Sequence, residues 1–225
     1  MNQLNIKAFA GLLQLLVIMA VMIFLPAWTL HYWQAWAFLA LFSVSVLAIT
    51  LYLMKNDPKL LERRTKAGPG AEQDKAQNII QAVAASAFIA MFVVSALDHR
   101  FAWSTVPPYV TAFGDILIVL GLYFVFLVFK ENSFASGTIE VGAEQRVITT
   151  GPYALVRHPM YIGALVMLLG VPLALGSLWG LLAIVPMVLV IVWRLLDEEK
   201  FLAKNLAGYS EYQRKVRHRL LPLIW

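Results

Sequence analysis

Long apolar runs separated by short polar connections dominate the chain. A helix needs about 20 apolar residues to cross the hydrocarbon core of a bilayer. Four runs clearly meet this requirement, at residues 9–28, 35–54, 79–97 and 109–129. The pattern therefore predicts four membrane-spanning helices in the first 130 residues.

A fifth apolar stretch, residues 160–196, is interrupted by the sequence GVPLALGSLWG. Gly170, Pro172, Gly176 and Gly180 are expected to break the helix there, which predicts two segments that form a helical hairpin. The first segment, 161–175, is short for a full crossing, so a re-entrant helix and a tightly packed crossing both stay open. Together the runs predict an all-α integral membrane protein with about six transmembrane segments.

The positive charges occupy alternate connections between these runs. Of the 18 Lys and Arg residues, 17 lie in the N-terminal segment, in residues 55–75 and 130–157, and from Arg194 onward; the exception is Arg100. The positive-inside rule then places both termini in the cytoplasm and requires an even number of crossings. With compact loops and no organellar signal, we expect a multi-pass protein of a prokaryotic inner membrane.

Composition agrees with this assignment and excludes several kinds of site. Hydrophobic residues make up 60% of the chain and charged residues 14%, against about a quarter charged in soluble domains. Cysteine is absent, which excludes disulfides, thiolate nucleophiles and Cys-ligated metals. The four histidines are scattered, so we expect no metal site. No interleaved basic and aromatic run accompanies the net charge of +5, so we expect no nucleic-acid binding.

Polar residues concentrate in the C-terminal part of the chain. We expect one membrane domain, 1–225, in which residues 1–130 are mainly scaffold helices and residues 131–225, with a cytoplasmic loop and C-terminal helices, carry the functional region.

Charged residues border the last two apolar segments. Arg157 and His158 stand at the entrance of one, and Arg194 and Glu198 are four apart on one face of the other. Such residues are either interfacial anchors or functional groups, because a charge inside an apolar span is costly. Two arginines and a carboxylate beside a glycine-rich loop suit an anionic ligand next to a cationic one. The residues alone predict a cytoplasmic anion-binding site and name no reaction.

Three runs carry a resemblance to a known superfamily. VITTGPYALVRHPMYIGA (147–164), RLLDEEKFL (194–202) and GYSEYQRKVRHRLLP (208–222) occur in this order on one side of the membrane. From about Phe129 to the C-terminus, the chain resembles the isoprenylcysteine carboxyl methyltransferase and phospholipid methyltransferase superfamily. The first four helices add only matching hydropathy.

The resemblance implies methyl transfer from S-adenosyl-L-methionine by an integral membrane enzyme, whose loop and C-terminal helices enclose the cofactor. It makes Arg157 and Arg194 the catalytic residues that bind an anionic acceptor. The cofactor-binding positions that it implies are Thr138, Gln145, Arg146, Val147, Ile148, Gly151, Tyr153, His158, Pro159, Met160, Tyr161, Glu198 and Glu199.

The acceptor separates three hypotheses. The leading one is carboxyl O-methylation of a lipid-like or isoprenylcysteine-type substrate that enters from the bilayer, because a carboxylate is already ionised at pH 7. The second is N-methylation of a phosphatidylethanolamine-type headgroup, which requires the loss of a proton. The third is a non-catalytic membrane protein that binds or transports an anion. The acceptor and the oligomeric state are left open.

Overall fold

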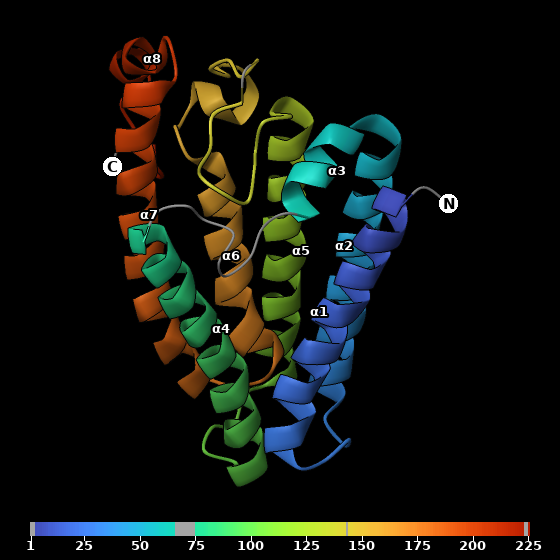
Figure 1. The fold of residues 1–225 in the computed structure, drawn as a ribbon. Coiled ribbons are helices and arrows are strands. Elements are labelled where there is room, and N and C mark those ends of the chain that lie inside the picture. Colours follow the sequence, from blue (N-terminus) through green and yellow to red (C-terminus); the bar gives the residue numbers. More distant parts are fainter. Residues whose placement is uncertain (1–2, 66–74, 143, 223–224) are drawn as a thin grey trace.

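A computed structural model describes residues 3–65, 75–142, 144–222 and 225. In these residues every regular element is helical (Figure 1), and the prediction of an all-α integral membrane protein is confirmed. The long helices are α1 (Gln3–Ala27), α2 (Trp33–Asn56), α4 (Lys75–Phe101), α5 (Pro108–Glu131), α6 (Pro159–Ala174) and α7 (Ile184–Asn205). The short ones are α3 (Pro58–Thr65), α8 (Tyr209–Lys215) and the 3₁₀ turns η1 (Gly151–Ala154) and η2 (Trp179–Ala183).

Five segments of the described chain are long and apolar enough to cross a membrane. They are α1, α2, α4, α5 and the combined η2 and α7, Trp179–Asn205. The four runs predicted in the first 130 residues lie within the first four of these helices, apart from Trp28, which directly follows α1. The sixth segment, α6, has 16 residues, which corresponds to about 24 Å of helix against about 30 Å of hydrocarbon.

Despite its length, α6 runs from the end of the bundle that carries α3 and α8 to the connections at the opposite end. The hydroxyl of Tyr32, between α1 and α2, donates a hydrogen bond of 2.6 Å to the carbonyl of Leu175, just after α6. The hydroxyl of Ser177 donates to the carboxylate of Asp98 at the end of α4, at 2.6 Å. α6 and α7 therefore form the expected helical hairpin, with its turn among the other connections at that end.

Glycines allow α6 to pack directly against α5. Gly114 and Gly121 of α5 face Gly170 and Gly163 of α6, and a Cβ atom at Gly121 would lie 2.5 Å from the backbone nitrogen of Met167. Backbones approach this closely only where both helices carry small residues. The glycine pairs thus fix the first half of α6 against the middle of α5 and the second half of α6 against the N-terminal part of α5.

The predicted interruption of the last apolar stretch is confirmed between α6 and η2, and the predicted first segment, 161–175, agrees with α6. Two of the four residues expected to break the helix nevertheless lie within it. Gly170 and Pro172 both lie inside α6, where Gly170 serves the contact with α5. The helix ends only after Ala174, and Gly176 follows with a φ of +68°.

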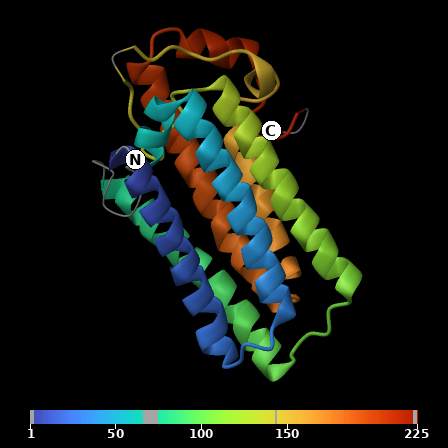
Figure 2. The same cartoon turned by 90° about the vertical axis from the view of Figure 1, so that its right-hand side faces the viewer.

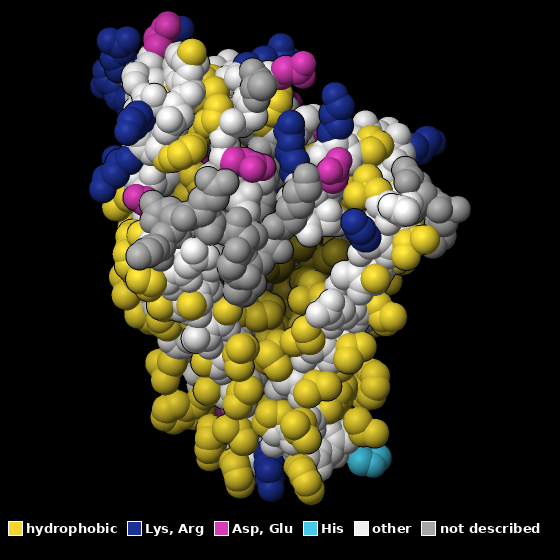
Figure 3. All heavy atoms as spheres, viewed as in Figure 1, with side chains coloured by type: hydrophobic (Ala, Val, Ile, Leu, Met, Phe, Trp, Pro, Cys, Tyr) yellow, Lys and Arg dark blue, Asp and Glu magenta, His cyan; other side chains and the backbone are white. Residues whose placement is uncertain are grey.

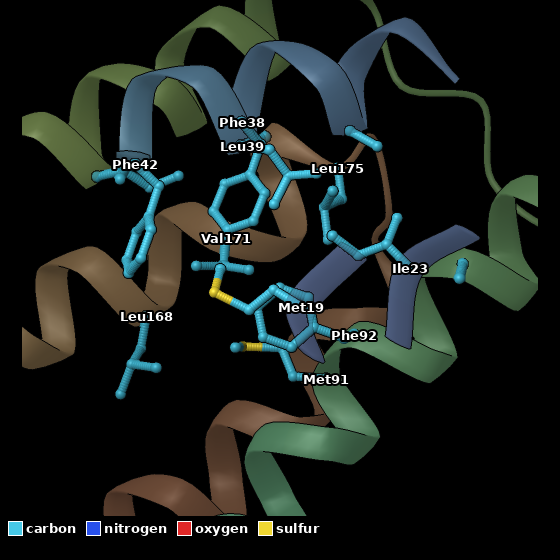
Figure 4. Packing of buried hydrophobic residues seen from close by; sticks show 14 of the residues in the cluster. Met19, Ile23, Phe38, Leu39, Phe42, Met91, Phe92, Leu168, Val171 and Leu175 are labelled. Atoms are coloured by element: carbon cyan, nitrogen blue, oxygen red, sulfur yellow. The ribbon is translucent and has the colours of Figure 1, made fainter. Parts of the chain in front are cut away.

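Buried apolar side chains from several helices meet in one cluster (Figure 4). Because lipid tails are as apolar as these side chains, close packing supplies most of what holds such helices together. Members of the cluster labelled in Figure 4 are Met19, Ile23, Phe38, Leu39, Phe42, Met91, Phe92, Leu168, Val171 and Leu175.

The two ends of the bundle differ in charge. α3, α8 and the start of α1 lie near one end in both views of the ribbon (Figures 1 and 2). On the face shown in Figure 3, Lys and Arg side chains gather over that end, whereas hydrophobic side chains cover most of the rest. Arg100 lies in the last turn of α4, at the opposite end. This asymmetry matches the charge pattern of the sequence; the cytoplasmic location of the charged end stays a prediction.

Candidate active site

A pocket lies at the charged end, between the loop after α5, η1, the first turn of α6, the end of α7 and α8. It contains about 790 Å³ of empty space, counting the part open to solvent, and small-molecule pockets span about 300–1,000 Å³. The structure brings eleven of the predicted site residues into its wall: Thr138, Gln145, Arg146, Val147, Ile148, Tyr153, Arg157, His158, Met160, Tyr161 and Glu198.

Four predicted site residues lie outside the wall. Gly151 begins η1 with a φ of +57°, and a Cβ atom there would lie 3.0 Å from the carboxylate of Glu131. Pro159 is buried as the first residue of α6, where its missing N–H costs least. Glu199 is buried. Arg194 donates a hydrogen bond to the carbonyl of Gly137 in the loop after α5, which is called the pocket loop below.

Glu198 presents its carboxylate to the pocket. Its Oε2 atom accepts a hydrogen bond of 2.7 Å from the hydroxyl of Tyr161 and lies 4.0 Å from Nδ1 of His158. The side chain is 26% exposed. α6 and α7 together therefore hold one partly accessible negative charge in the pocket wall.

Glu199, the next residue, is enclosed by positive groups. Its carboxylate accepts hydrogen bonds from Nε of Arg157 at 2.5 Å and from Nε of Arg219 at 3.0 Å. Nε2 of His158 lies 3.2 Å away, and the side chain of Glu199 is 6% exposed. A buried carboxylate with this set of partners joins the start of α6, the end of α7 and the C-terminal segment.

Arg157 fastens the C-terminal segment to the site. Its Nη1 atom donates to the carbonyls of Val216 and Arg217, at 2.8 and 2.9 Å. Its backbone N–H also donates to the carbonyl of His218. The guanidinium that the sequence assigns to an anionic acceptor thus contacts Glu199 and the backbone; its role toward the acceptor stays a prediction.

Arg194 connects α7 with α4 and with the pocket loop. Its Nη1 atom donates to Oε1 of Gln77 at 3.0 Å, and its Nη2 atom donates to the carbonyl of Gly137 at 2.9 Å. Gly137 directly precedes Thr138, which lines the pocket. Arg194 therefore acts on the pocket loop from the side of the spanning helices, and its contact with an acceptor also stays a prediction.

Sequence reasoning missed several residues of the pocket wall. Asn132 donates to the hydroxyl of Tyr153 at 2.8 Å, and Tyr212 donates to the carbonyl of Tyr153 at 2.7 Å. Burial raises the pKa of Tyr153 to about 12, so this phenol is protonated at neutral pH. The hydroxyl of Tyr209 is buried and has no hydrogen-bond partner among the described residues. Tyrosines 209 and 212 stand three apart, a spacing that places both on one helix face.

A comparison with protein families matches the part of the chain that builds this pocket. Residues 109–208 match the family described as phospholipid methyltransferase. The match covers just under half of the chain and extends from the start of α5 to the residue before α8. None of the curated proteins matches the chain. Over residues 109–208, the chain is thus similar to the phospholipid methyltransferase family, which is part of the isoprenylcysteine/phospholipid methyltransferase superfamily.

Proposed function

We propose that the protein transfers a methyl group from S-adenosylmethionine to the carboxylate of a lipid-like or isoprenylcysteine-type substrate at the membrane interface. The observation that carries the proposal is the partly exposed carboxylate of Glu198 in a pocket at the charged end of the bundle. The pocket is built almost entirely from the residues that match the methyltransferase family.

The residues of the pocket fit this cofactor. The buried hydroxyl of Tyr209 lacks a partner, and an unpaired buried polar group is costly unless a ligand satisfies it. The carboxylate of Glu198 suits ribose hydroxyls, an amino group or a sulfonium. Val147, Leu202 and Leu206 contribute apolar side chains to the pocket wall, which suit the flat adenine ring of the cofactor.

The contribution of the chain is then to orient the reactants and to exclude water. When bound, S-adenosylmethionine supplies a methyl group whose carbon bonds to a carboxylate oxygen while the broken C–S electron pair stays on sulfur, so no proton moves. Holding two reactants in line accounts for a large part of the barrier reduction in such displacements. Tyr161 keeps Glu198 in place through its hydrogen bond, and Asn132 and Tyr212 hold Tyr153 in the wall.

The hydrogen-bond partners of the consecutive carboxylates Asp197, Glu198 and Glu199 favour a carboxylate acceptor over an amine. Glu199 is enclosed by Arg157, His158 and Arg219, and Asp197 accepts a hydrogen bond from Gln77. Glu198 accepts from Tyr161 and is assigned to the cofactor. An amine must lose a proton to a positioned base, whereas a carboxylate at pH 7 needs none. We therefore place O-methylation ahead of N-methylation.

The experiment is a methyl-transfer assay with labelled S-adenosylmethionine and two acceptors, N-acetyl-S-farnesylcysteine and phosphatidylethanolamine vesicles. We expect a base-labile product from the first, because methyl esters are hydrolysed by base and methylamines are not. A base-stable lipid product would support the phospholipid alternative instead. Cofactor binding without transfer to either acceptor would contradict the proposal and favour a non-catalytic protein.

Glu211→Gln provides a matched control for substitutions at Glu198. Glu211 is an exposed carboxylate on α8 whose ion pair within the described part of the chain is with Lys215, at 2.9 Å. We expect this variant to transfer methyl groups as the unaltered protein does.

A further inference from the structure

A second cavity lies between the N-terminal half of α1, α2 and α3. It contains about 1,940 Å³ of empty space, counting its opening. Leu12, Leu15 and Val46 are among its apolar walls, and Lys7 and Arg64 lie at its charged end. Figure 3 shows a hollow with hydrophobic walls on this face, beside α1. The cavity combines the apolar walls and the basic end that an anionic amphiphile requires.

α1 leaves this space open because it carries a glycine where it faces the cavity. A Cβ atom added at Gly11 would meet nothing within 4 Å. By contrast, a Cβ atom at Gly121 would meet backbone at 2.5 Å. Gly11 is therefore not required by helix packing, and a side chain at this position would extend into the cavity.

Arg64 belongs to the wall of this cavity and also contacts the methyltransferase pocket. Its Nη1 atom lies 3.2 Å from the carbonyl oxygen of Ser136 and 3.8 Å from Sδ of Met160. Both of these residues line the pocket. The guanidinium also lies 5.0 Å above the ring of Phe129. The side chain of Arg64 thus lies between the second cavity and the pocket of the candidate active site.

Arg64 of α3 lies beside a carbonyl, a sulfur atom and an aromatic ring, with no carboxylate among its contacts to the described residues. Among the described residues no carboxylate forms an ion pair with Arg64, although Glu62 lines the same cavity. Burial lowers the pKa of Arg64, and the nearby charge of Arg194 lowers it further, while Tyr161 raises it. Two neighbouring guanidinium groups in a partly buried place favour an anion between or beside them.

We propose that this cavity is the acceptor site, and that its ligand is a lipid with one apolar chain and a carboxylate. The carboxylate binds Arg64 beside Met160 and Ser136, and the chain lies along α1 and α2 against Leu12, Leu15 and Val46. The inference rests on the proposed carboxyl methylation and adds the route by which the acceptor reaches the pocket. A carboxylate bound to Arg64 lies beside Ser136 and Met160, which line the pocket proposed for the cofactor.

The direct test is photolabelling of the full-length protein in detergent, without cofactor. The probe is N-acetyl-S-farnesylcysteine with a diazirine in the farnesyl chain, compared with its methyl ester. We expect the carboxylate probe to label peptides of α1 and α2 around Leu12 and Val46, and the ester to label them at least about tenfold less, which corresponds to the loss of one charge-assisted contact.

Two variants and one control define the site. Gly11→Phe fills the cavity and should reduce labelling by both probes. Arg64→Gln should reduce labelling by the carboxylate probe to that of the ester, and Arg64→Lys should restore part of it. Ala48→Phe enters the separate groove between α2 and α5 and should change neither.

Several results would overturn the inference. Unaltered labelling in both Gly11→Phe and Arg64→Gln would do so, as would labelling of the groove at Ala48. Stronger competition by phosphatidylethanolamine vesicles than by the unlabelled carboxylate lipid would identify a bilayer phospholipid as the occupant instead.

Calorimetry with S-adenosylmethionine on the same samples separates this inference from the proposed function. Normal labelling without cofactor binding contradicts the proposed function. If the protein binds the cofactor and transfers methyl groups, but Gly11→Phe and Arg64→Gln are labelled normally, the proposed acceptor site is contradicted and the proposed function is not.

Discussion

Glu198 and Glu199 are neighbours in the chain, yet the first faces the pocket and the second is enclosed behind it. The side chain of Glu198 is 26% exposed and accepts one hydrogen bond from Tyr161. The side chain of Glu199 is 6% exposed and lies among Arg157, His158 and Arg219. Adjacent residues on a helix point about 100° apart, so the helix assigns these carboxylates different tasks.

Glu199→Gln should destabilise the protein. The change leaves the buried guanidinium of Arg157 without its counter-charge, and breaking a buried ion pair on one side costs about 3–5 kcal/mol. Denaturant-induced unfolding of the purified protein in mild detergent measures this loss. Glu198→Gln is the comparison and should change the free energy of unfolding by less than about 1 kcal/mol. Equal losses in the two variants would show that the difference in burial has no energetic consequence.

Tyr209→Phe should weaken cofactor binding while leaving the fold intact. The hydroxyl has no partner among the described residues, so its removal takes no internal hydrogen bond from the protein. If it binds the cofactor, the affinity for S-adenosylmethionine should fall by about three- to tenfold, as expected for one neutral hydrogen bond.

Tyr212→Phe is the matched variant for Tyr209→Phe on the same helix. Tyr212 donates to the carbonyl of Tyr153 at 2.7 Å, so here we expect a loss of unfolding free energy of about 1 kcal/mol. Calorimetric titration and denaturant unfolding of both variants measure the two effects. A Tyr209→Phe protein that binds the cofactor normally would contradict the assignment of its hydroxyl.

Gly121→Leu should separate α5 from α6. The Cβ atom would lie 2.5 Å from the backbone nitrogen of Met167, and backbone cannot yield as a flexible side chain does. Overpacking typically costs about 1–3 kcal/mol, and contact with backbone places this variant at the upper end. Unfolding in detergent measures the loss, and Gly11→Leu, in open space, should show none. Similar stability of the two variants would rule out the tight glycine contact.

The spans could be predicted from sequence because lipid imposes a simple rule on length and polarity. The interruption of the last apolar stretch could also be located from sequence, but not which of its glycines and prolines end the helix. Gly170 and Pro172 are read as helix breakers in isolation, but in α6 Gly170 is needed for contact with α5. The difference lies in tertiary packing, which a linear pattern does not contain.

In the candidate site, too, local motifs could be predicted from sequence, whereas contacts between distant residues could not. The runs at 147–164 and 194–202 predict His158, Tyr161 and Glu198 as site residues, and all three lie in the pocket wall. Sequence could not show that Arg157 binds the C-terminal segment, because that contact joins residues about 60 positions apart. Nor could it single out Arg64 among the cations of its connection, since its contact with Met160 depends on how α3 folds back.

The central claim is tested most directly by isothermal titration of S-adenosylmethionine into the detergent-purified full-length protein. We predict one binding site per chain, an affinity at least about tenfold weaker in Glu198→Gln, as expected for the loss of a charge-assisted hydrogen bond, and unchanged binding in Glu211→Gln. Absence of binding to the unaltered protein, or equal affinity in Glu198→Gln, would contradict the account.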